Sequence, residues 1–515
     1  MRQPRVFLIG AGPGDPGLIT ARGLECLRRA DVVLHDHLVH ERLLRHAPRG
    51  AEVIDVGTAA PQPMAQEAIC YLLAEKAREG KVVARLKWGD PFVFDRGGEE
   101  ALFLHEQGVA FEVVPGIPAG IGVPAYAGVP VTYPGGGDTL TMVRGYEDES
   151  KTIPDVDWAS IARLEGTVVC YAGAQQLPRI LDALIANGWP AEAPAVIVYN
   201  GTLTSQVTVA GTLAELLRGL ESAPRGRAAI LVAGRVAGFR DHLRWFDERP
   251  LFGKRVLVTR PRDQAAELCD ALAALGADAI EAPMIRIVPP EDPAPLQDAA
   301  ARAGEFDWIV FTSGNAVQAF MDALFAGGAD IRALKGPKLC AVGSSTADKL
   351  AAWHLKVDLV PPEFKAEGVA GALAAQGSLQ GARVLLPRSD IGREVVLEEL
   401  RRAGAVVTDV VAYRTLIDDV QREEEPDIYG MLLERKIDVV TFTSASAVRN
   451  FARVYGADQA ADLLRNAVVA AIGPVTAHAA EQLGIEVSVQ PATHTIAALV
   501  DAIAAHFTAM AGKLA

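Results

Sequence analysis

Short apolar runs recur along the chain, and most of them end at glycine or aspartate. The segments VFLIG at residues 6–10, VVARLKWGD at residues 82–90 and AAILVAG at residues 228–234 show the pattern. Continuous apolar runs alternating with amphipathic, helix-spaced stretches are typical of strands buried on both faces of a mainly parallel sheet. In open sheets of this kind, ligands bind in loops beyond the carboxyl ends of the strands. The pattern therefore predicts an α/β protein whose sites lie in such loops.

The second half of the chain repeats itself about 130 residues out of register. The segment GKRVLVTRPRDQAAELCDALAALGADAI, which begins at residue 253, matches GARVLLPRSDIGREVVLEELRRAGAVVT, which begins at residue 381. The blocks FDWIVFTSGNAVQAF and CAVGSSTADKLAAWHLKVDLVP are answered in the same order by IDVVTFTSASAVRNF and AAIGPVTAHAAEQLGIEVSVQP. Each copy has the pattern of three strand and helix pairs. The repeat thus predicts two similar α/β lobes of parallel sheet, with helices on both faces and a site in a cleft between them.

A polar linker separates the two halves. The stretch FRDHLRWFDERPLFG at residues 239–253 divides two unlike patterns. We therefore expect one domain over residues 1–248 and a second over residues 253–515. The strand series of the first half starts again after residues 135–137, which favours a further division there.

The repeat also bears on the composition of the two lobes in the second domain. We expect one lobe to combine residues 253–262 with residues 381–515, and the other to span residues 263–380. The sequence leaves open whether the two copies exchange segments.

Composition and charge narrow the class of protein. Half of the 515 residues are hydrophobic and 22% are charged, which excludes a disordered or fibrous chain. Acidic residues outnumber basic ones by 64 to 50, and the net charge of −14 argues against a nucleic-acid partner. The five cysteines form no CxxC pair and the ten histidines show no metal-ligand spacing, so we expect neither a disulfide framework nor a metal site. Without a signal peptide or a long apolar run, a cytoplasmic protein with no membrane association is expected.

The first chemical motif is the turn GAGPGD at residues 10–15, which follows a strand and precedes a helical pattern. A dinucleotide fingerprint would need a third glycine where Asp15 stands, and Pro13 lacks an amide that could bind phosphate. A carboxylate at this position suits a cationic or hydroxyl-bearing ligand better. A purely structural turn is the alternative.

Further motifs follow in the first half. These are the loop GDPFVFDRGGEE at residues 89–100 and then EVVPGI, PAYAGVP, VVCYAG and YNGT. In this order they resemble the tetrapyrrole methylases that use S-adenosylmethionine, most closely uroporphyrinogen-III C-methyltransferase. The resemblance covers residues 5–246 and implies a two-lobed methylase fold.

The resemblance also implies cofactor contacts. They map onto Pro13, Trp88, Gly89, Asp90, Val93, Pro118, Ala119, Ala172 and Gly201. The chain departs from the family pattern at several positions. Trp88 and Asp95 stand where glycine is usual, Pro118 where threonine or serine is usual, and Ala172 where methionine is usual.

Methylation of a pyrrole carbon leaves a cation that must lose a proton, so a carboxylate base near the ring is chemically useful. Asp36 matches the position of the family's proton acceptor, with a loop cap as the structural alternative. Thr58 stands where the family has a proton-donating lysine, and a hydroxyl cannot replace an ammonium group as an acid. Either the lysine is dispensable, Arg85 or Lys87 compensates for it, or the first half methylates poorly.

The second half carries RVLVTRP, two FTSxxAV blocks, VVAYRT, AAIGPVTA and TIAALVDAI. Across nearly its whole length it resembles uroporphyrinogen-III synthase, a family of two α/β lobes around a cleft that needs no cofactor. That reaction closes hydroxymethylbilane with loss of water, and the leaving hydroxyl needs an O–H donor. Tyr413 is the candidate acid, with Thr476 as a further catalytic candidate. A buried core tyrosine is the alternative for Tyr413.

Groups that would hold the substrate carboxylates are arginines and turn hydroxyls. The candidates are Arg260, Thr312, Ser313, Arg388, Ser444 and Ser446. Helix caps and surface salt bridges are the alternative roles.

These observations predict a bifunctional enzyme that makes uroporphyrinogen III and methylates it to precorrin-2 with S-adenosylmethionine. The alternative is an active synthase fused to a catalytically weak methyltransferase-like binding module. A nucleotide-binding oxidoreductase is disfavoured by Asp15. The expected partners are small tetrapyrroles, and a homodimer through the methyltransferase half remains open.

Overall fold

The computed structural model describes residues 5–48, 50–57, 64–136, 139–145, 156–164, 166–220, 228–361, 366–390, 394–417 and 427–514. The chain forms two compact units. Unit 1 comprises residues 1–254, 272–278 and 507–515, and unit 2 comprises residues 255–271 and 279–506. We describe each unit by itself. The break at residue 254 lies just beyond the polar linker of the sequence.

Unit 1 begins with a parallel sheet in the order β3-β2-β4-β1-β5. Its strands are β1 (Val6–Gly10), β2 (Val32–His35), β3 (Glu52–Asp55), β4 (Val83–Lys87) and β5 (Phe111–Val114). The helices between them are α1 (Ala21–Leu27), α2 (Glu41–Leu44), α3 (Gln66–Arg78) and α4 (Gly97–Glu106). Successive side chains of β1 enter different cores, since Val6 and Leu8 pack on one face and Phe7 and Ile9 on the other. Burial of both faces explains the continuous apolar run in the sequence.

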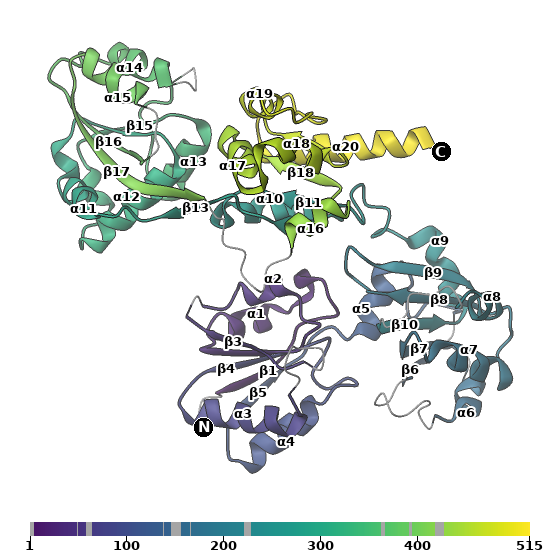
Figure 1. The fold of residues 1–515 in the computed structure, drawn as a ribbon. Helices are drawn as coiled ribbons and strands as arrows, with labels where there is room; N and C mark the ends of the chain where they lie inside the picture. The colour runs from purple at the N-terminus through teal and green to yellow at the C-terminus, as the bar shows by residue number, and fades with distance from the viewer. Residues whose placement is uncertain are drawn as a thin grey trace. The chain divides into compact units, whose positions relative to one another are not determined.

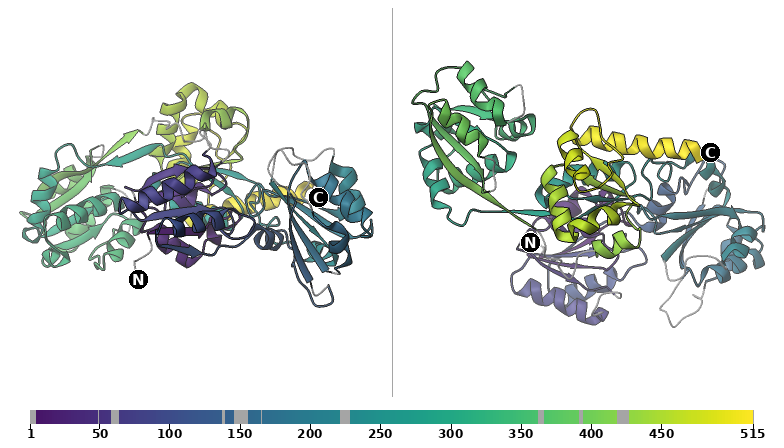
Figure 2. Two further views of the ribbon diagram at one scale, coloured as in Figure 1. Left: turned by 90° about the horizontal axis from the view of Figure 1, so that it is seen from below. Right: turned by 45° about the horizontal axis from the view of Figure 1, so that its top comes forward.

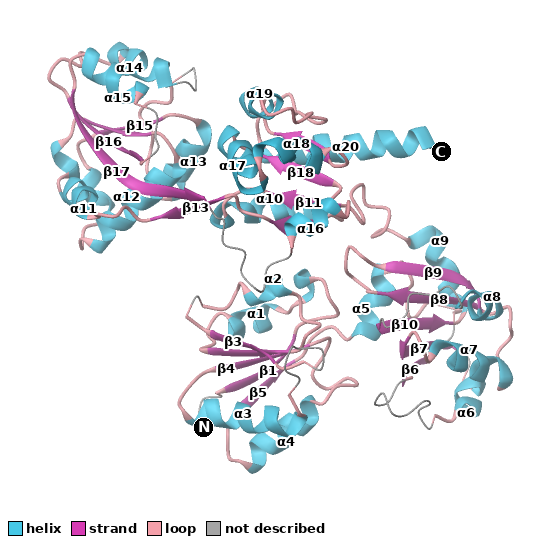
Figure 3. Ribbon diagram, in the orientation of Figure 1, coloured by secondary structure: helices cyan, strands magenta, loops and turns pink. Residues whose placement is uncertain are grey.

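The second sheet of unit 1 is mixed, in the order β6-β7-β10-β8-β9, with only β6 and β7 parallel among the registers described (Figures 1 and 3). Its strands are β6 (Thr139–Arg144), β7 (Gly166–Gly173), β8 (Pro194–Tyr199), β9 (Val207–Thr212) and β10 (Ala228–Ala233). The accompanying helices are α5 (Ala119–Tyr126), α6 (Trp158–Arg163), α7 (Leu177–Ala186), α8 (Leu213–Gly219) and α9 (Arg240–Leu243). Helix α5 precedes residues 135–137, yet Ala119 and Val123 pack into the core of this second sheet. The core therefore changes before α5, earlier than the division that the sequence favoured.

Unit 2 contains two α/β lobes. The split lobe, whose elements come from residues 255–281 and 428–514, has β11 (Arg255–Val258), β12 (Asp278–Glu281), β18 (Val439–Phe442) and β19 (Val468–Ala471). Within these stretches, residues 272–278 and 507–514 are the ones counted with unit 1 above. Its helices are α10 (Arg262–Ala274), α16 (Ile428–Leu433), α17 (Ala445–Tyr455), α18 (Ala457–Leu464), α19 (Pro474–Glu481) and α20 (Ile496–Leu514). The sheet order is β12-β11-β18-β19. The described pairs β11 with β18 and β18 with β19 are parallel, as the pattern predicted.

The contiguous lobe, residues 285–417, has β13 (Ile285–Val288), β14 (Trp308–Phe311), β15 (Lys338–Ala341), β16 (Arg383–Ser389) and β17 (Val406–Ile417). Its sheet order is β13-β17-β16-β14-β15, and every described pair except the antiparallel β13 and β17 is parallel. Helices α11 (Ala294–Ala301), α12 (Gly314–Ala326) and α13 (Ser344–Ala352) contribute to one core, and α14 (Ala366–Ala375) and α15 (Val395–Arg402) to another. Figure 1 and the turned views of Figure 2 show the helices on both sides of this sheet, which confirms the α/β class.

Corresponding strands of the two repeat copies occupy corresponding positions in the two sheets of unit 2. Apart from β13 at the edge of the five-stranded sheet, the first two strands of each order belong to one copy of the repeat and the last two to the other. Thus β11 and β12 come from the first copy and pair with β18 and β19 of the second. Conversely, β16 and β17 come from the second copy and pair with β14 and β15 of the first. The copies exchange their first strand, helix and strand unit.

This exchange corrects the lobe bounds expected from the sequence. The division into residues 253–262 with 381–515, and residues 263–380, separates β11 from α10 and β12. It also places β16 and β17 in the wrong lobe. Strands joined by one helix usually stay neighbours in a sheet, and both of these pairs do so.

Candidate functional site

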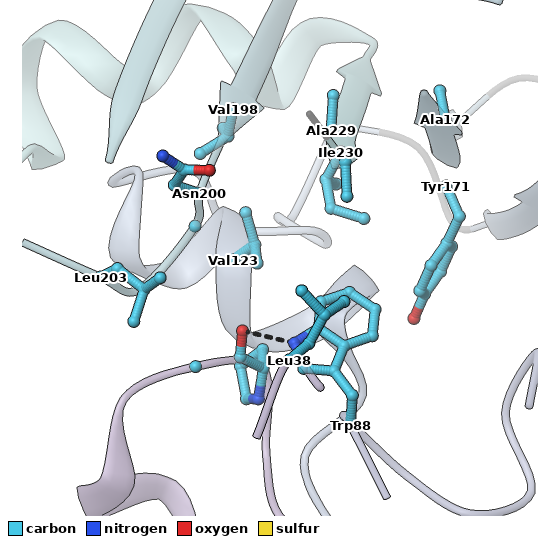
Figure 4. A pocket seen from close by; sticks show the side chains of 14 residues that line it. Leu38, Trp88, Val123, Tyr171, Ala172, Val198, Asn200, Leu203, Ala229 and Ile230 are labelled. Atoms are coloured by element: carbon cyan, nitrogen blue, oxygen red, sulfur yellow. Dashed lines mark hydrogen bonds between the residues drawn. The ribbon is translucent and has the colours of Figure 1, made fainter. Parts of the chain in front are cut away.

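Unit 1 contains a cavity of about 230 Å³ beside the carboxyl ends of β1 and β4. Its walls also come from α5 and from strands β7, β8 and β10 (Figure 4). The lining residues are Pro13, Gly14, Leu38, Trp88, Val123, Tyr171, Ala172, Val198, Asn200, Gly201, Leu203, Ala228, Ala229 and Ile230. Most of these side chains are apolar. A largely apolar pocket with a few polar groups is the usual form of a small-molecule site.

The glycine-rich turn next to this cavity is built by close backbone approach. A Cβ on Gly10 would lie 2.5 Å from the Gly116 Cα, so no larger residue fits there. Gly12 and Gly14 have φ values of 80° and 154°, which glycine adopts readily. The Gly12 N–H also donates to the Gly89 carbonyl at 3.2 Å, and the Gly89 N–H donates back to Gly12 at 2.8 Å. These bonds tie the turn to the β4 loop.

Asp15 is bound by the protein itself. Its carboxylate accepts the Gly17 N–H at 2.7 Å and the Tyr126 O–H at 2.7 Å, while its own N–H donates to Thr202 Oγ1 at 2.9 Å. Burial and the bond to Asp15 raise the pKa of Tyr126. The sequence favours a cationic or hydroxyl-bearing ligand at this carboxylate, whereas in the structure a hydroxyl of the protein itself, that of Tyr126 in α5, bonds to it. Asp15 therefore links the glycine-rich turn to α5, whose residues Ala119 and Val123 pack against the second sheet.

Trp88 has contacts on both its backbone and its side chain. Its N–H donates to Asp36 Oδ2 at 3.0 Å, and its indole Nε1–H donates to the Pro13 carbonyl at 3.0 Å, the dashed line in Figure 4. The left-handed conformation falls on the next residue, Gly89, at φ 72°, and not on Trp88. The exchange of glycine for tryptophan at position 88 thus introduces no backbone strain.

Asp36 belongs to a buried network of charges. Arg85 Nη2 lies 2.5 Å from Asp36 Oδ1, and Arg85 Nε lies 3.2 Å from Glu100 Oε1. Lys87 Nζ lies 3.0 Å from both Glu100 Oε1 and Asp95 Oδ1. The side chains of Arg85, Lys87 and Glu100 are at most 2% exposed, whereas that of Asp36 is 24% exposed. The side chain of Asp95 is 19% exposed, so Asp36 and Asp95 are the carboxylates of the network that a ligand can reach, whereas Glu100 is fully buried.

The network shifts the pKa values of two of its carboxyl groups in opposite directions. Burial alone would raise the pKa of Asp36, but the Arg85 guanidinium, assisted by Lys87, holds that pKa below its usual value. Burial and the charge of Asp36 raise the pKa of Asp95, although Lys87 opposes the rise. Asp36 is consequently ionised at neutral pH and available to accept a proton.

In unit 2, Tyr413 lies at the core of the contiguous lobe with 9% of its surface exposed. Its hydroxyl lies 3.1 Å from Ser313 Oγ. Ser313 also caps α12, because its Oγ accepts the Ala316 N–H at 3.2 Å. Tyr413 thus combines a buried ring with a hydroxyl held by the FTS turn.

The other synthase candidates have structural partners. Ser444 caps α17 by accepting the Ala447 N–H at 3.1 Å, the same role that Ser313 has in the repeat. Arg388 forms a two-pronged ion pair with Asp409 through Nε at 2.6 Å and Nη2 at 2.8 Å, and this bond raises the pKa of Arg388. A substrate carboxylate at Arg388 would have to compete with Asp409.

The remaining candidates lie at the expected strand ends or helix starts. Arg260 Nη2 donates to Gln264 Oε1 at 3.4 Å, and Thr312 is half-buried beside Ser313. Ser446 lies in the first turn of α17, while Thr476 in α19 is only 4% exposed. The roles of all these residues toward substrate stay predictions.

Comparisons with known proteins match the two halves of the chain to two different protein families. The family model of tetrapyrrole (corrin/porphyrin) methylases matches residues 5–217, and that of uroporphyrinogen-III synthase HemD matches residues 266–501. The porphyrin biosynthesis protein HemD of Ruminiclostridium josui is 36% identical over 452 residues, which cover 88% of this chain and 89% of that protein. The chain belongs to this family of proteins that join a tetrapyrrole methylase to a uroporphyrinogen-III synthase.

Two other relatives are similar to parts of the chain. The uroporphyrinogen-III C-methyltransferase of Bacillus subtilis is 36% identical over 381 residues, covering 74% of this chain and 78% of that protein. A structure of the uroporphyrin-III C-methyltransferase of Thermus thermophilus, complexed with S-adenyl homocysteine, is 36% identical. It covers 45% of this chain and 99% of that one, with a TM-score of 0.40.

Four of the nine cofactor-contact residues that the methylase resemblance implies line the cavity. Pro13, Trp88, Ala172 and Gly201 line it. The other five have positions in the adjoining loops. Gly89 packs near Pro118 and Ala119, Asp90 accepts the Gly116 N–H at 2.9 Å, and the Val93 N–H donates to the Asp90 carbonyl at 3.4 Å. Thr58 lies outside the described residues.

Several site residues were not identified from the sequence. Tyr171 and Leu38 line the cavity but look like ordinary strand and loop hydrophobics in the sequence. Asn200 offered a signal, since it ends an apolar strand in the YNGT motif, and it adopts φ 48°. Arg85 and Lys87 were named from the sequence only as possible substitutes for the lysine, although charged residues inside an apolar strand also imply the buried partners that the structure shows. Among the described residues, no cluster of side chains could hold a metal ion and no helix has the length and hydrophobicity needed to cross a bilayer.

Proposed function

We propose that unit 1 transfers methyl groups from S-adenosylmethionine to uroporphyrinogen III, giving precorrin-2. We propose further that unit 2 makes uroporphyrinogen III from hydroxymethylbilane with loss of water. The observation that carries the first proposal is the apolar cavity next to an ionised, partly exposed Asp36. Membership in the joined family supports the second.

The residues around the cavity fit an adenosyl ligand. Apolar side chains such as Val123 and Leu203 suit the faces of an adenine ring, and the Asn200 amide offers a polar contact. Gly201 keeps its side of the cavity open, because a Cβ there would lie 2.4 Å from Val123. When bound, S-adenosylmethionine supplies an electrophilic methyl group.

Asp36 is the proposed proton acceptor. A pyrrole carbon that receives a methyl group becomes part of a cation, and loss of a proton restores the conjugated ring. The Asp36 carboxylate takes that proton, while Arg85 and the Trp88 N–H fix its orientation. Because its pKa is held low, Asp36 returns the proton to water readily and is ready for another methylation.

Tyr413 is the proposed acid of unit 2. Its phenol donates a proton to the hydroxyl that leaves hydroxymethylbilane as water, and the bilane then closes with inversion of its last ring. Ser313, 3.1 Å from the phenol oxygen, orients the hydroxyl and links it to the start of α12. The neutral phenol places no full charge in the mainly apolar core before the reaction, and the phenolate that donation leaves takes back the proton that is released when the last ring closes.

One anaerobic experiment tests both proposals. The full chain is incubated with hydroxymethylbilane, with and without S-adenosylmethionine, and products are followed by absorbance and mass. Without the methyl donor, uroporphyrinogen III should accumulate. With the donor, a product carrying two additional methyl groups should replace it. Failure to form the type III isomer refutes the synthase proposal, and failure to methylate added uroporphyrinogen III refutes the methyltransferase proposal.

A second candidate for unit 1 is a binding module with weak methyltransferase activity attached to an active synthase. Trp88 favours it, because the indole occupies the Pro13 carbonyl at the cavity. In this case the same incubation yields uroporphyrinogen III that stays unmethylated, and unit 1 retains the tetrapyrrole without turning it over.

A further inference from the structure

The indole of Trp88 forms a contact that a ligand in the cavity would also seek. Its Nε1–H donates to the Pro13 carbonyl at 3.0 Å, and both residues line the cavity. Figure 4 shows the ring beside Leu38, with Tyr171 and Ala172 further along the cavity. The protein therefore already satisfies the carbonyl of a residue that the methylase resemblance assigns to the cofactor site.

The small volume of the cavity agrees with the Trp88 indole filling part of the ligand site. Its volume of about 230 Å³ is smaller than the roughly 300–1,000 Å³ of ordinary small-molecule sites. Trp88 is one of its walls and packs against the core cluster formed by α5, β7, β8 and β10. Withdrawal of an indole from this wall would enlarge the cavity and free the Pro13 carbonyl together.

The backbone restricts how the indole can leave. The Trp88 N–H is bonded to Asp36 Oδ2 at 3.0 Å, and the next residue is bonded to Gly12 in both directions. The main chain at position 88 is thus fixed on both sides. Movement of the ring must come from rotation of its own side-chain bonds, which leaves the contact between the backbone and Asp36 intact.

We infer that Trp88 is an internal competitor for the polar contact at Pro13 and thereby weakens binding of an adenosyl ligand to the cavity. The inference rests on the proposed methyl-donor site. Binding of the ligand requires that the indole give up its hydrogen bond and turn aside, so part of the interaction energy is spent on displacing the protein's own side chain. Trp88 therefore sets the affinity of the site and leaves its chemistry to Asp36.

The test measures the affinity for S-adenosylhomocysteine by calorimetry on the full chain. Trp88→Phe keeps an aromatic ring and lacks the N–H donor, and Trp88→Leu is a second variant without a donor. Both should bind roughly 2- to 10-fold tighter than the wild type, the range expected when one competing hydrogen bond is removed. Trp245→Phe is the matched control, because the Trp245 indole also donates to a backbone carbonyl at 3.0 Å, that of Ala125, outside the cavity lining. This control should bind as the wild type does.

Tryptophan emission gives an independent measurement. The ligand should change the emission of the wild type and of Trp245→Phe as the Trp88 indole changes its surroundings. In Trp88→Phe most of that change should be missing.

The outcomes separate this inference from the proposed function. Equal or weaker binding by both Trp88 variants, with a normal affinity in the wild type, overturns the competitor role and leaves the methyl-donor site standing. No detectable binding by the wild type and by every variant refutes the methyl-donor site, and the inference falls with it. Tighter binding by Trp245→Phe to the same degree would also overturn the specific role of Trp88.

Discussion

Asp36→Asn should abolish most methylation while leaving the cavity intact. The substitution preserves the shape of the side chain but removes its charge. Arg85 donates to Oδ1 of Asp36 and the Trp88 N–H to Oδ2, and in asparagine an NH2 group that cannot accept takes one of these two positions, so one of the two bonds is lost. Asparagine cannot take a proton from the methylated ring at neutral pH.

The magnitudes follow from these contacts. A positioned base contributes about 10²- to 10⁴-fold to rate, so methylation should fall by that factor. Arg85 keeps Glu100 as a partner at 3.2 Å, so its buried charge is not left alone. The loss of stability should therefore be about 2–3 kcal/mol, the value of a charge-assisted hydrogen bond, and not the larger cost of an isolated buried ion.

The pH dependence has a definite sign. The pKa of Asp36 is lowered on folding, so its contribution to stability is fully present above its unfolded pKa of about 3.9 and is lost as pH falls through its lower folded pKa. The difference in urea midpoint between wild type and Asp36→Asn should stay constant from neutral pH down to mildly acidic pH. It should narrow only below about pH 4.

The assay compares anaerobic methylation of uroporphyrinogen III with the calorimetric affinity for S-adenosylhomocysteine. Asp55→Asn is the control, because Asp55 ends the neighbouring strand β3, pairs with His37 at 3.0 Å and also has a lowered pKa. The control should methylate normally. If Asp36→Asn keeps more than about a tenth of the wild-type rate, the proton-acceptor argument is wrong. If its affinity for S-adenosylhomocysteine collapses, Asp36 maintains the cavity instead.

Three further predictions concern other parts of the chain. Tyr413→Phe should slow formation of the type III isomer from hydroxymethylbilane by roughly 10²-fold, and unchanged turnover would leave Tyr413 as a core residue. Tyr171→Phe removes the hydroxyl that accepts the buried Gly120 N–H at 2.7 Å, so urea unfolding should show a loss of about 1–3 kcal/mol. An unaltered midpoint would mean that this bond contributes nothing net. The fragment of residues 253–515 should fold and cyclise hydroxymethylbilane alone, and an insoluble or inactive fragment would contradict its independence.

The α/β class could be predicted from the sequence because a strand that is buried on both faces can be recognised from its own residues. Burial on both faces produced apolar runs such as residues 6–10, whatever strands lie beside them. No local pattern of residues shows which strands belong to which lobe. Self-similarity shows that β14 of the first copy and β18 of the second are alike, but it does not show which of the two pairs with β11. The choice of partner depends on contacts such as that between the Arg255 N–H and Asp438 Oδ2, 183 positions away.

Residues of the candidate site could be predicted from the sequence, but their contacts with one another could not. Motif order led to Pro13, Trp88, Ala172 and Gly201, which do line one cavity. It did not reveal that the Trp88 indole bonds to Pro13, because a rotamer depends on the space that distant segments leave. Nor did it show that Asp409 already holds Arg388, since the two residues stand on neighbouring strands, β16 and β17.

The exchanged strands of unit 2 impose an order on its folding during synthesis. The contiguous lobe has all of its strands once residue 417 has left the ribosome. The split lobe cannot be completed then, because β11 and β12 must wait for β18, some 160 residues beyond β12, or roughly 8–30 s at ordinary translation rates. During that interval the edge of β11 that later binds β18 has no partner strand. We therefore expect nascent chains arrested shortly after residue 417 to bind chaperones through residues 255–281, and full-length chains to release them.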